Sequence, residues 1–189
     1  MIQVPAQEFD DGYRAAIDPW CFATSPYEQR RYDITMACLP EPRFERAFEP
    51  GCSIGELTGR LAGRCGRVVA WDASPTVVAY ARQRLASLHH VEIAVGDVPR
   101  QWPSGRFDLV ILSEIAYYFD VAALEVLAER AIGSLDPAGT LMAVHWLGES
   151  DSHLLHGDEV HAVLARQGGL HHRGHFRDPG FRLDWWSRC

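Results

Sequence analysis

The stretch 44–72 restricts the possible folds more than any other part of the chain. It contains an apolar run that ends at Glu49, a turn marked by Gly51 and Gly55, and a second apolar run that ends at Asp72. Glycine suits a tight strand-to-helix turn in which the backbone comes close to a ligand. An acid about 20 residues after such a turn can accept both hydroxyls of a ribose. The stretch therefore predicts a strand–turn–helix–strand unit that binds a nucleoside.

Ser53 distinguishes this turn from a dinucleotide-binding turn. In G-x-G-x-x-G the middle glycine lets a pyrophosphate approach the backbone, whereas Ser53 stands at that position here. Glu49 would repel a pyrophosphate and would suit a cation. The N-terminus of the helix after Gly55 is expected to offer unpaired N–H groups to an anionic group.

The pattern Glu49-x-Gly51-x-Ser53-x-Gly55 resembles motif I of the class I S-adenosylmethionine-dependent methyltransferases and departs from it at Ser53. The resemblance implies that this turn holds the methionine part of the cofactor and that Asp72 holds the ribose. It also implies that the acid after the third strand accepts the adenine amine. The cofactor residues expected on this basis are Glu49, Gly51, Cys52, Ser53, Gly55, Asp72, Ala73, Asp97, Val98, Ser113 and Glu114.

Strand and helix patterns alternate along the chain, which predicts a parallel sheet with helices on both faces. Asp178-Pro-Gly180 is a turn signal between two strand-like runs and favours a C-terminal antiparallel hairpin. We expect an α/β, Rossmann-like doubly wound sheet in one domain, 1–189, with an N-terminal lid or helix (1–40) and a core (41–189). The predicted strands are 44–49, 68–72, 91–95, 107–113, 140–146, 170–177 and 181–187, and the predicted helices are 55–64, 76–86, 121–134 and 158–166.

The first 25 residues lack sustained periodicity but are rich in aromatic side chains, among them Trp20. Ser25-Pro-Tyr-Glu28 has the residues of a helix start, with Ser at the N-cap, Pro at N1 and Glu at N3. The aromatic segment before it is either a lid over a cofactor or a simple packing element for that helix.

Composition excludes several classes of function. The chain has a net charge of −7, which argues against a general nucleic-acid surface, and it has no Lys, which excludes a Schiff-base or phosphate-loop lysine. Its five cysteines include no C-x-x-C pair, which favours a reduced compartment over a disulfide scaffold. No signal peptide or membrane-spanning run is visible. We expect a cytoplasmic protein without a membrane or nucleic-acid partner.

Residues after the fourth strand are candidates for contacting the methyl acceptor. Ligands lie beyond the carboxyl ends of the strands in open α/β sheets. Because the methyl donor is a sulfonium, transfer needs no metal, and catalysis is mainly alignment of the acceptor in a water-poor pocket. A protonated amine must first lose its proton, and Glu114 is placed to take it. The alternative is that Glu114 caps the following helix.

The histidines after the fifth strand have two interpretations. His145 at the strand end and His161 on the following helix are expected to line the acceptor pocket, with His145 as a possible base. A metal set is the alternative, but the spacings of His153, His156 and His161 match no zinc signature, so we expect no metal. A surface position is expected for His89, His90, His171, His172 and His175 and is one option for His153.

A closer resemblance is carried by Asp18-Pro-Trp20, by Ser25-Pro-Tyr-Glu-Gln-Arg-Arg-Tyr32 and by Glu114-Ile-Ala-Tyr-Tyr-Phe-Asp120. These segments are similar to the nodulation protein S family, N-methyltransferases that act on the free amine of a deacetylated glucosamine in chito-oligosaccharides. The resemblance implies that Trp20 and Arg31 enclose the cofactor and that Glu114 and Tyr117 face the acceptor. Tyr118 and His161 are then expected to contact the substrate.

The function expected from the sequence is methyl transfer from S-adenosylmethionine, with S-adenosylhomocysteine as product, to an amino group of an amino sugar or another small molecule. The runner-up is an O-methyltransferase with His145 as base, and the third possibility is a cofactor-binding module without catalysis. DNA-base methylation is disfavoured, because Ser113-Glu-Ile-Ala-Tyr117 lacks a proline pair. The sequence leaves the acceptor, the number of transfers and the oligomeric state open.

Overall fold

The computed structural model describes residues 1–189, which divide into two compact units. The N-terminal unit is Pro5–Asp97, and the C-terminal unit is Met1–Val4 together with Val98–Cys189. The main boundary between the units therefore falls after the third strand.

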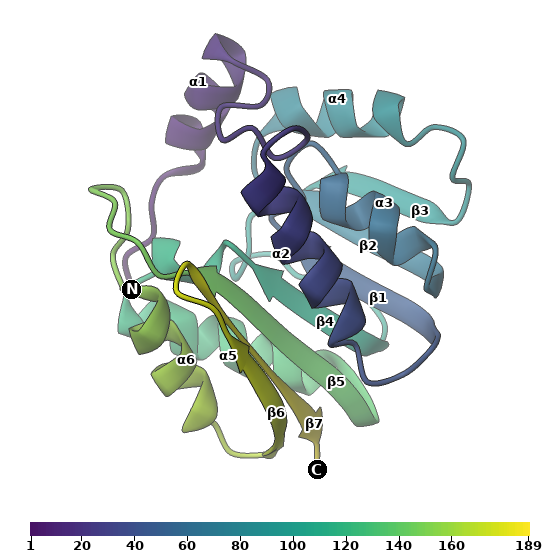
Figure 1. The fold of residues 1–189 in the computed structure, drawn as a ribbon, viewed down its shortest axis with the longest axis vertical. Coiled ribbons are helices and arrows are strands. Elements are labelled where there is room, and N and C mark those ends of the chain that lie inside the picture. Colours follow the sequence, from purple (N-terminus) through teal and green to yellow (C-terminus); the bar gives the residue numbers. More distant parts are fainter. The chain divides into compact units, whose positions relative to one another are not determined.

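The N-terminal unit contains three parallel strands in the order β3-β2-β1 (Figure 1). Helix α3 packs on β2, and α4 packs on β2 and β3. Apolar residues of β1 and β2 fill the core, with Phe48, Val68 and Val69 inaccessible to solvent or nearly so. The elements are α1 (Ala6–Ala15), α2 (Pro26–Ala37), β1 (Phe44–Pro50), α3 (Glu56–Ala62), β2 (Cys65–Asp72), α4 (Pro75–Arg84) and β3 (Val91–Val95).

Helix α1 lies within the first 25 residues, which lack sustained periodicity in the sequence. Asp10 accepts hydrogen bonds from the Ser74 hydroxyl (2.6 Å) and the Thr76 N–H (3.1 Å), at the start of α4. Tyr13 packs with Ile54 and Val77 in a small core. Asp10 and Tyr13 thus anchor α1 through contacts to residues far away in the chain.

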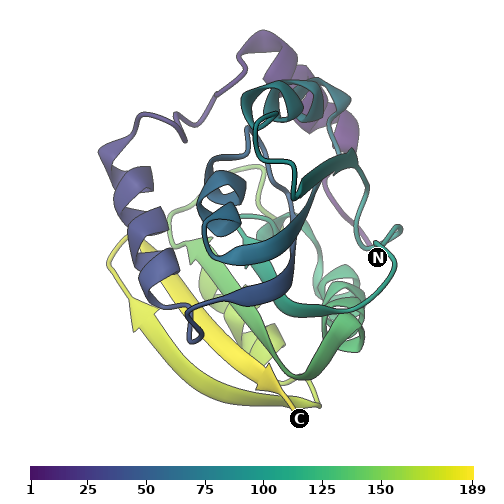
Figure 2. The ribbon, with the colours of Figure 1, turned by 90° about the vertical axis from the view of Figure 1, so that its right-hand side faces the viewer.

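The C-terminal unit contains four strands in the order β4-β5-β7-β6. Strands β4 and β5 are parallel, whereas β7 is antiparallel to both β5 and β6. In Figure 2 the yellow hairpin β6–β7 runs alongside the green strand β5. The elements are β4 (Phe107–Ser113), the 3₁₀ turn η1 (Ala116–Tyr118), α5 (Val121–Ser134), β5 (Leu135–Trp146), α6 (Gly157–Ala165), β6 (Leu170–Arg177) and β7 (Phe181–Arg188).

The predicted hairpin turn is confirmed at Asp178-Pro-Gly180. The Asp178 carboxylate accepts the Gly180 N–H (2.8 Å), and the Asp178 N–H donates to Phe181 (2.9 Å). Strand β5 begins earlier than predicted, at Leu135 instead of residue 140. No helix of either unit combines the length and apolar character needed to cross a membrane.

Candidate functional site

The loop after β1 has the backbone conformation that its glycines predict. Gly51 (φ 75°), Ser53 (φ 48°) and Gly55 (φ 79°) all lie in the left-handed region. Glycine reaches that region without strain, whereas serine does so at a cost. The Tyr13 hydroxyl donates to the Ser53 hydroxyl (2.8 Å). A side chain from α1 thus stabilises the position where this loop departs from the methyltransferase motif.

Most backbone N–H groups of this loop bond within the N-terminal unit. Those of Gly51 and Cys52 donate to the Trp71 carbonyl, and that of Gly55 donates to Cys52. The Ser53 N–H donates to Asp72. These four groups are therefore not available to an anion, which fits the prediction that the turn does not bind a pyrophosphate.

Glu49 ends β1 as a buried carboxyl. Its Oε2 accepts a hydrogen bond from the Thr58 hydroxyl of α3 (2.6 Å). Burial raises the pKa of Glu49 to about 8, against the Thr58 hydrogen bond and with a further contribution from the charge of Asp72. At neutral pH this carboxyl is therefore mostly protonated, and a neighbouring cation would favour its ionised form.

Asp72 ends β2 and joins two loops. Its Oδ2 accepts the Ser53 N–H (2.9 Å), and its Oδ1 accepts the Ser74 N–H (3.0 Å). Burial raises the pKa of Asp72 to about 6 in spite of these hydrogen bonds. A carboxylate has about four acceptor positions, so both oxygens can still accept hydroxyl hydrogens. Cys52 is also buried, and burial raises the pKa of its thiol.

The other residues expected around the cofactor have diverse surroundings. Trp20 is 42% exposed and stacks on Phe22, with Tyr13 edge-on to it. Arg31 is buried and forms an ion pair with Glu28. Helix α2 begins where predicted, with Ser25 as the N-cap and Pro26 at N1, although the Ser25 side chain makes no capping hydrogen bond. Ala73, Asp97 and Ser113 are half-buried after or at the ends of their strands, and Val98 is buried.

Glu114 follows β4 with its carboxylate held by two donors. The Trp146 N–H donates to Oε1 (2.7 Å), and the Tyr117 hydroxyl donates to Oε2 (2.9 Å). Its backbone has φ 55°, a conformation that is uncommon for a residue with a side chain. The C-terminal unit thus presents a half-buried carboxylate whose orientation is set by β5 and by the turn η1.

His153, for which a surface position was one expectation, packs on this group instead. Its ring lies on the Tyr117 ring, with centroids 3.8 Å apart and an angle of 18° between the planes, while Trp146 and Tyr118 contact it edge-on. Burial lowers the pKa of His153, and the charge of Glu114 opposes that effect. His153 lies in a loop without periodicity, so no sequence signal placed it here.

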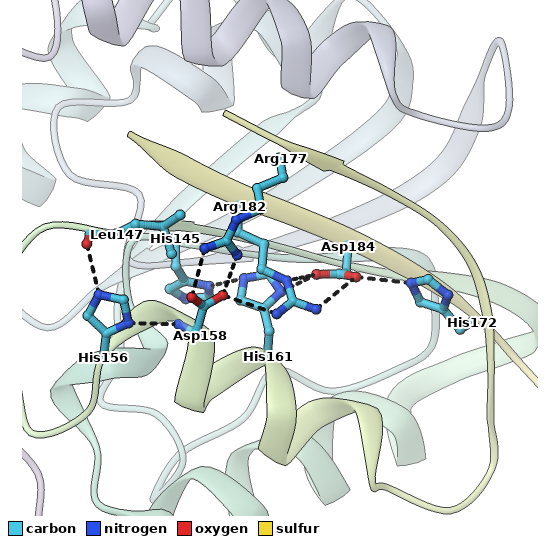
Figure 3. A network of polar contacts seen from close by, with 9 residues as sticks. All are labelled: His145, Leu147, His156, Asp158, His161, His172, Arg177, Arg182 and Asp184. Atoms are coloured by element: carbon cyan, nitrogen blue, oxygen red, sulfur yellow. Dashed lines mark hydrogen bonds and ion pairs between the residues drawn. The ribbon is translucent and has the colours of Figure 1, made fainter. Parts of the chain in front are cut away.

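His145 and His161 lie in the interior, each with both ring nitrogens bonded (Figure 3). The Ala116 N–H donates to His145 Nε2 (3.2 Å), and His145 Nδ1 lies 3.1 Å from His161 Nε2. His161 Nδ1 is 2.6 Å from Asp184. The direct contact with an acceptor expected of both histidines does not fit this arrangement, because neither ring has an unbonded nitrogen.

Charged side chains surround the outer end of this network (Figure 3). Arg182 bonds to both Asp184 (2.6 Å) and Asp158 (3.1 Å), and Arg177 binds both oxygens of Asp158. His156 accepts the Asp158 N–H at Nδ1 and contacts the Leu147 carbonyl through Nε2. The histidines after β5 therefore pair with carboxylates and backbone groups.

Residues 8–168 match the family model of nodulation protein S (NodS). The chain belongs to the nodulation protein S family. It is 32% identical to nodulation protein S of Sinorhizobium fredii over 130 residues, which are 68% of this chain and 60% of that protein. It is 29% identical to that of Rhizobium tropici over 149 residues, which are 75% and 63% of the two chains. This NodS family chain thus spans about three fifths of the length of these relatives.

Solved structures confirm the predicted fold. N-methyltransferase NodS from Bradyrhizobium japonicum WM9, in complex with S-adenosylhomocysteine, is 22% identical, with a TM-score of 0.85 over 97% of this chain and 98% of that one. A candidate methyltransferase from Pseudomonas syringae is 41% identical, with a TM-score of 0.77 over 86% and 99%. This member of the NodS family therefore has the Rossmann-like methyltransferase fold with a C-terminal antiparallel hairpin.

Proposed function

We propose that the protein transfers a methyl group from S-adenosylmethionine to the nitrogen of an amine. The buried pair Glu49 of β1 and Asp72 of β2, next to a loop with three left-handed residues, carries the proposal. The cofactor has an ammonium group that matches the Glu49 carboxyl and a ribose whose hydroxyls match the unused lone pairs of Asp72. Asp97 with Val98 is assigned to the adenine.

The cofactor supplies an electrophilic methyl on a sulfonium, and the residues of this chain have to deprotonate and orient the acceptor. We assign proton removal from an ammonium acceptor to Glu114. The Tyr117 hydroxyl and the Trp146 N–H hold its carboxylate in one orientation, which supports this role. Tyr118, which contacts Tyr117 edge-on, is assigned to substrate contact.

An amine is favoured over a hydroxyl as the acceptor. O-methylation would use His145 as the base. Because the His145 ring is buried with both nitrogens bonded, it is poorly placed to take a proton from a hydroxyl acceptor. The solved relative named above is an N-methyltransferase. We propose the amine of an amino sugar, as in a deacetylated chito-oligosaccharide, as the acceptor class. We also propose a cytoplasmic location and no nucleic-acid substrate, which the net charge of −7 supports.

Calorimetric titration of S-adenosylhomocysteine tests the cofactor assignment. Wild type is expected to bind, and Asp72→Ala is expected to bind at least about tenfold more weakly, which corresponds to about 1.4 kcal/mol. Asp72 also accepts two backbone N–H groups, so Asp72→Ala disturbs the loops as well as the ribose contact. Asp72→Asn is the matched variant, because it has nearly the same shape and keeps one acceptor oxygen in the same place. Absence of binding to the folded wild type would refute the proposal.

Transfer of a labelled methyl group to a fully deacetylated chitotetraose tests the acceptor assignment. The wild type is expected to incorporate label, whereas chitotetraose with every amine acetylated is expected to incorporate none. Label on the acetylated sugar alone would favour the O-methyltransferase reading instead.

A further inference from the structure

Three buried side chains from three elements form one hydrogen-bonded row in the C-terminal unit (Figure 3). His145 lies on β5, His161 on α6 and Asp184 on β7, and all three are at most 2% exposed. The distances along the row are 3.1 Å between the two imidazoles and 2.6 Å from His161 to the carboxylate. The row starts at the backbone N–H of Ala116, 3.2 Å from His145 Nε2.

The two ends of the row determine where each proton lies. An ionised carboxylate only accepts hydrogen bonds, so His161 must carry its proton on Nδ1 and accept at Nε2. His145 must then donate from Nδ1, which leaves Nε2 as an acceptor. The Ala116 N–H can only donate, and it meets that acceptor. Every bond in the row is therefore satisfied in one tautomer of each neutral ring, and moving either proton places two donors face to face.

The Ala116 N–H is the first of η1, the turn that connects Glu114 to Tyr117. We infer that His161 and Asp184 are positioning residues for the acceptor site, because they hold His145 in the tautomer that fixes η1 and thereby the Tyr117 hydroxyl on Glu114. The inference rests on the proposed function insofar as Glu114 and Tyr117 form the acceptor site. Neither His161 nor Asp184 touches the acceptor in this assignment.

The charged groups around the row favour this protonation state. Arg182 of β7 and His172 of β6 bond to the Asp184 carboxylate, and Asp158 of α6 with Arg177 of β6 lies beyond Arg182. Burial alone would raise the pKa of Asp184, but the hydrogen bonds of His161 and Arg182 outweigh it and lower the pKa to about 2. Burial lowers the pKa of His161 against the hydrogen bond and the charge of Asp184, which favours the neutral ring.

Two substitutions at one position separate positioning from packing. His161→Leu removes the acceptor that His145 Nδ1–H requires. His161→Gln places an amide oxygen near the former Nε2 and restores that acceptor. Leu164→Ala is the control, because Leu164 is fully buried on the same helix and takes no part in the row. All three are expected to lower the melting temperature, since each disturbs a packed core.

Nitrogen-15 spectra of the histidine rings and exchange of the Ala116 amide test the row without any activity measurement. Wild type is expected to show His145 and His161 protonated at Nδ1 and the Ala116 amide protected. His161→Leu is expected to speed exchange of that amide at least about tenfold, whereas His161→Gln and Leu164→Ala keep its protection. A proton on Nε2 of His145 in wild type, or unchanged Ala116 protection in His161→Leu, would overturn the inference.

Methyl transfer to deacetylated chitotetraose tests the consequence for the site. His161→Leu is expected to lower kcat/KM between about tenfold and a hundredfold with unchanged S-adenosylhomocysteine affinity, and His161→Gln is expected to restore most of it. If wild type transfers no methyl group, the proposed acceptor fails while the spectra still decide on the row. If the Ala116 amide exchanges faster in His161→Leu but kcat/KM for methyl transfer is unchanged, the positioning role is refuted.

Discussion

Glu49 and Asp72 end neighbouring parallel strands as two buried carboxyl groups that share one electrostatic environment. Burial raises the pKa of Glu49, and the charge of Asp72 raises it further, to about 8. Both groups thus lie in surroundings that disfavour their charged forms. Ionising them raises the free energy of the folded protein unless a ligand of opposite charge compensates for it. Such a pair is typical of a binding site for a group that carries positive charge and hydroxyls.

Glu49→Gln is expected to change how stability depends on pH. The folded carboxyl keeps its proton up to about pH 8, whereas an unfolded Glu loses it near pH 4.3. The folded state therefore binds more protons, and this group makes the protein less stable as pH rises through that window. Between pH 6.5 and 8 wild type should lose about 1.5 kcal/mol relative to Glu49→Gln.

Urea unfolding at pH 6.5 and 8 measures this difference. Glu8→Gln is the control, since Glu8 is an exposed carboxyl of the same unit. A parallel pH dependence of wild type and Glu49→Gln would show that Glu49 ionises in the folded protein as it does in the unfolded chain.

Glu114→Gln and Tyr117→Phe are expected to affect methyl transfer in different degrees. The amide of Glu114→Gln still accepts hydrogen bonds but cannot take a proton, so kcat should fall by about 10²-fold or more. Tyr117→Phe keeps the carboxylate and removes one of its two donors, so the loss should be smaller. Both variants should bind S-adenosylhomocysteine as wild type does. Full activity of Glu114→Gln on every accepted amine would refute its role as base.

Tyr13 and Ser53 are expected to be energetically coupled. Tyr13→Phe removes a buried hydrogen bond and should cost about 1 kcal/mol. Ser53→Gly loses the same bond but relieves the left-handed backbone of a non-glycine residue, so its net cost should be smaller. A double-mutant cycle by chemical denaturation should give a coupling energy of about 0.5–1.5 kcal/mol. Additive effects would mean that the hydroxyls do not stabilise each other.

His153 is expected to contribute to stability through its stack on Tyr117. His153→Ala removes that ring and should destabilise the protein by about 1 kcal/mol, whereas His153→Phe retains an aromatic face and should cost less. Thermal unfolding compares the two variants, and His171→Ala on the exposed strand β6 serves as the control. Equal melting temperatures for all three would indicate that the stack adds nothing.

Local sequence signals predicted the parts of the fold that depend on local chemistry. Ser74 accepts the Val77 N–H at the start of α4, as its Ser-Pro signature indicates. The glycines at 51 and 55 have positive φ, and Asp178 closes the C-terminal hairpin. Each of these features is decided by residues within a few positions of one another.

Features that depend on distant residues were not predictable in this way. Helix α1 is held by Asp10 and Tyr13 through contacts to α4 and the glycine loop. The row from His145 to Asp184 joins three elements, and no spacing along the chain encodes which imidazole nitrogen faces which partner.

The left-handed backbone of Glu114 lowers the stability of the fold, whereas its side chain supplies the carboxylate of the proposed acceptor site. Any side chain pays for that conformation, and glycine alone adopts it freely. Under selection for thermal resistance alone, other residues can replace Glu114 wherever relief of this strain outweighs the loss of the hydrogen bonds from Trp146 and Tyr117. Under selection for turnover, glutamate should persist there in spite of the strain. In long-term laboratory evolution, the residue found at position 114 would therefore indicate whether the chain is selected for stability or for turnover.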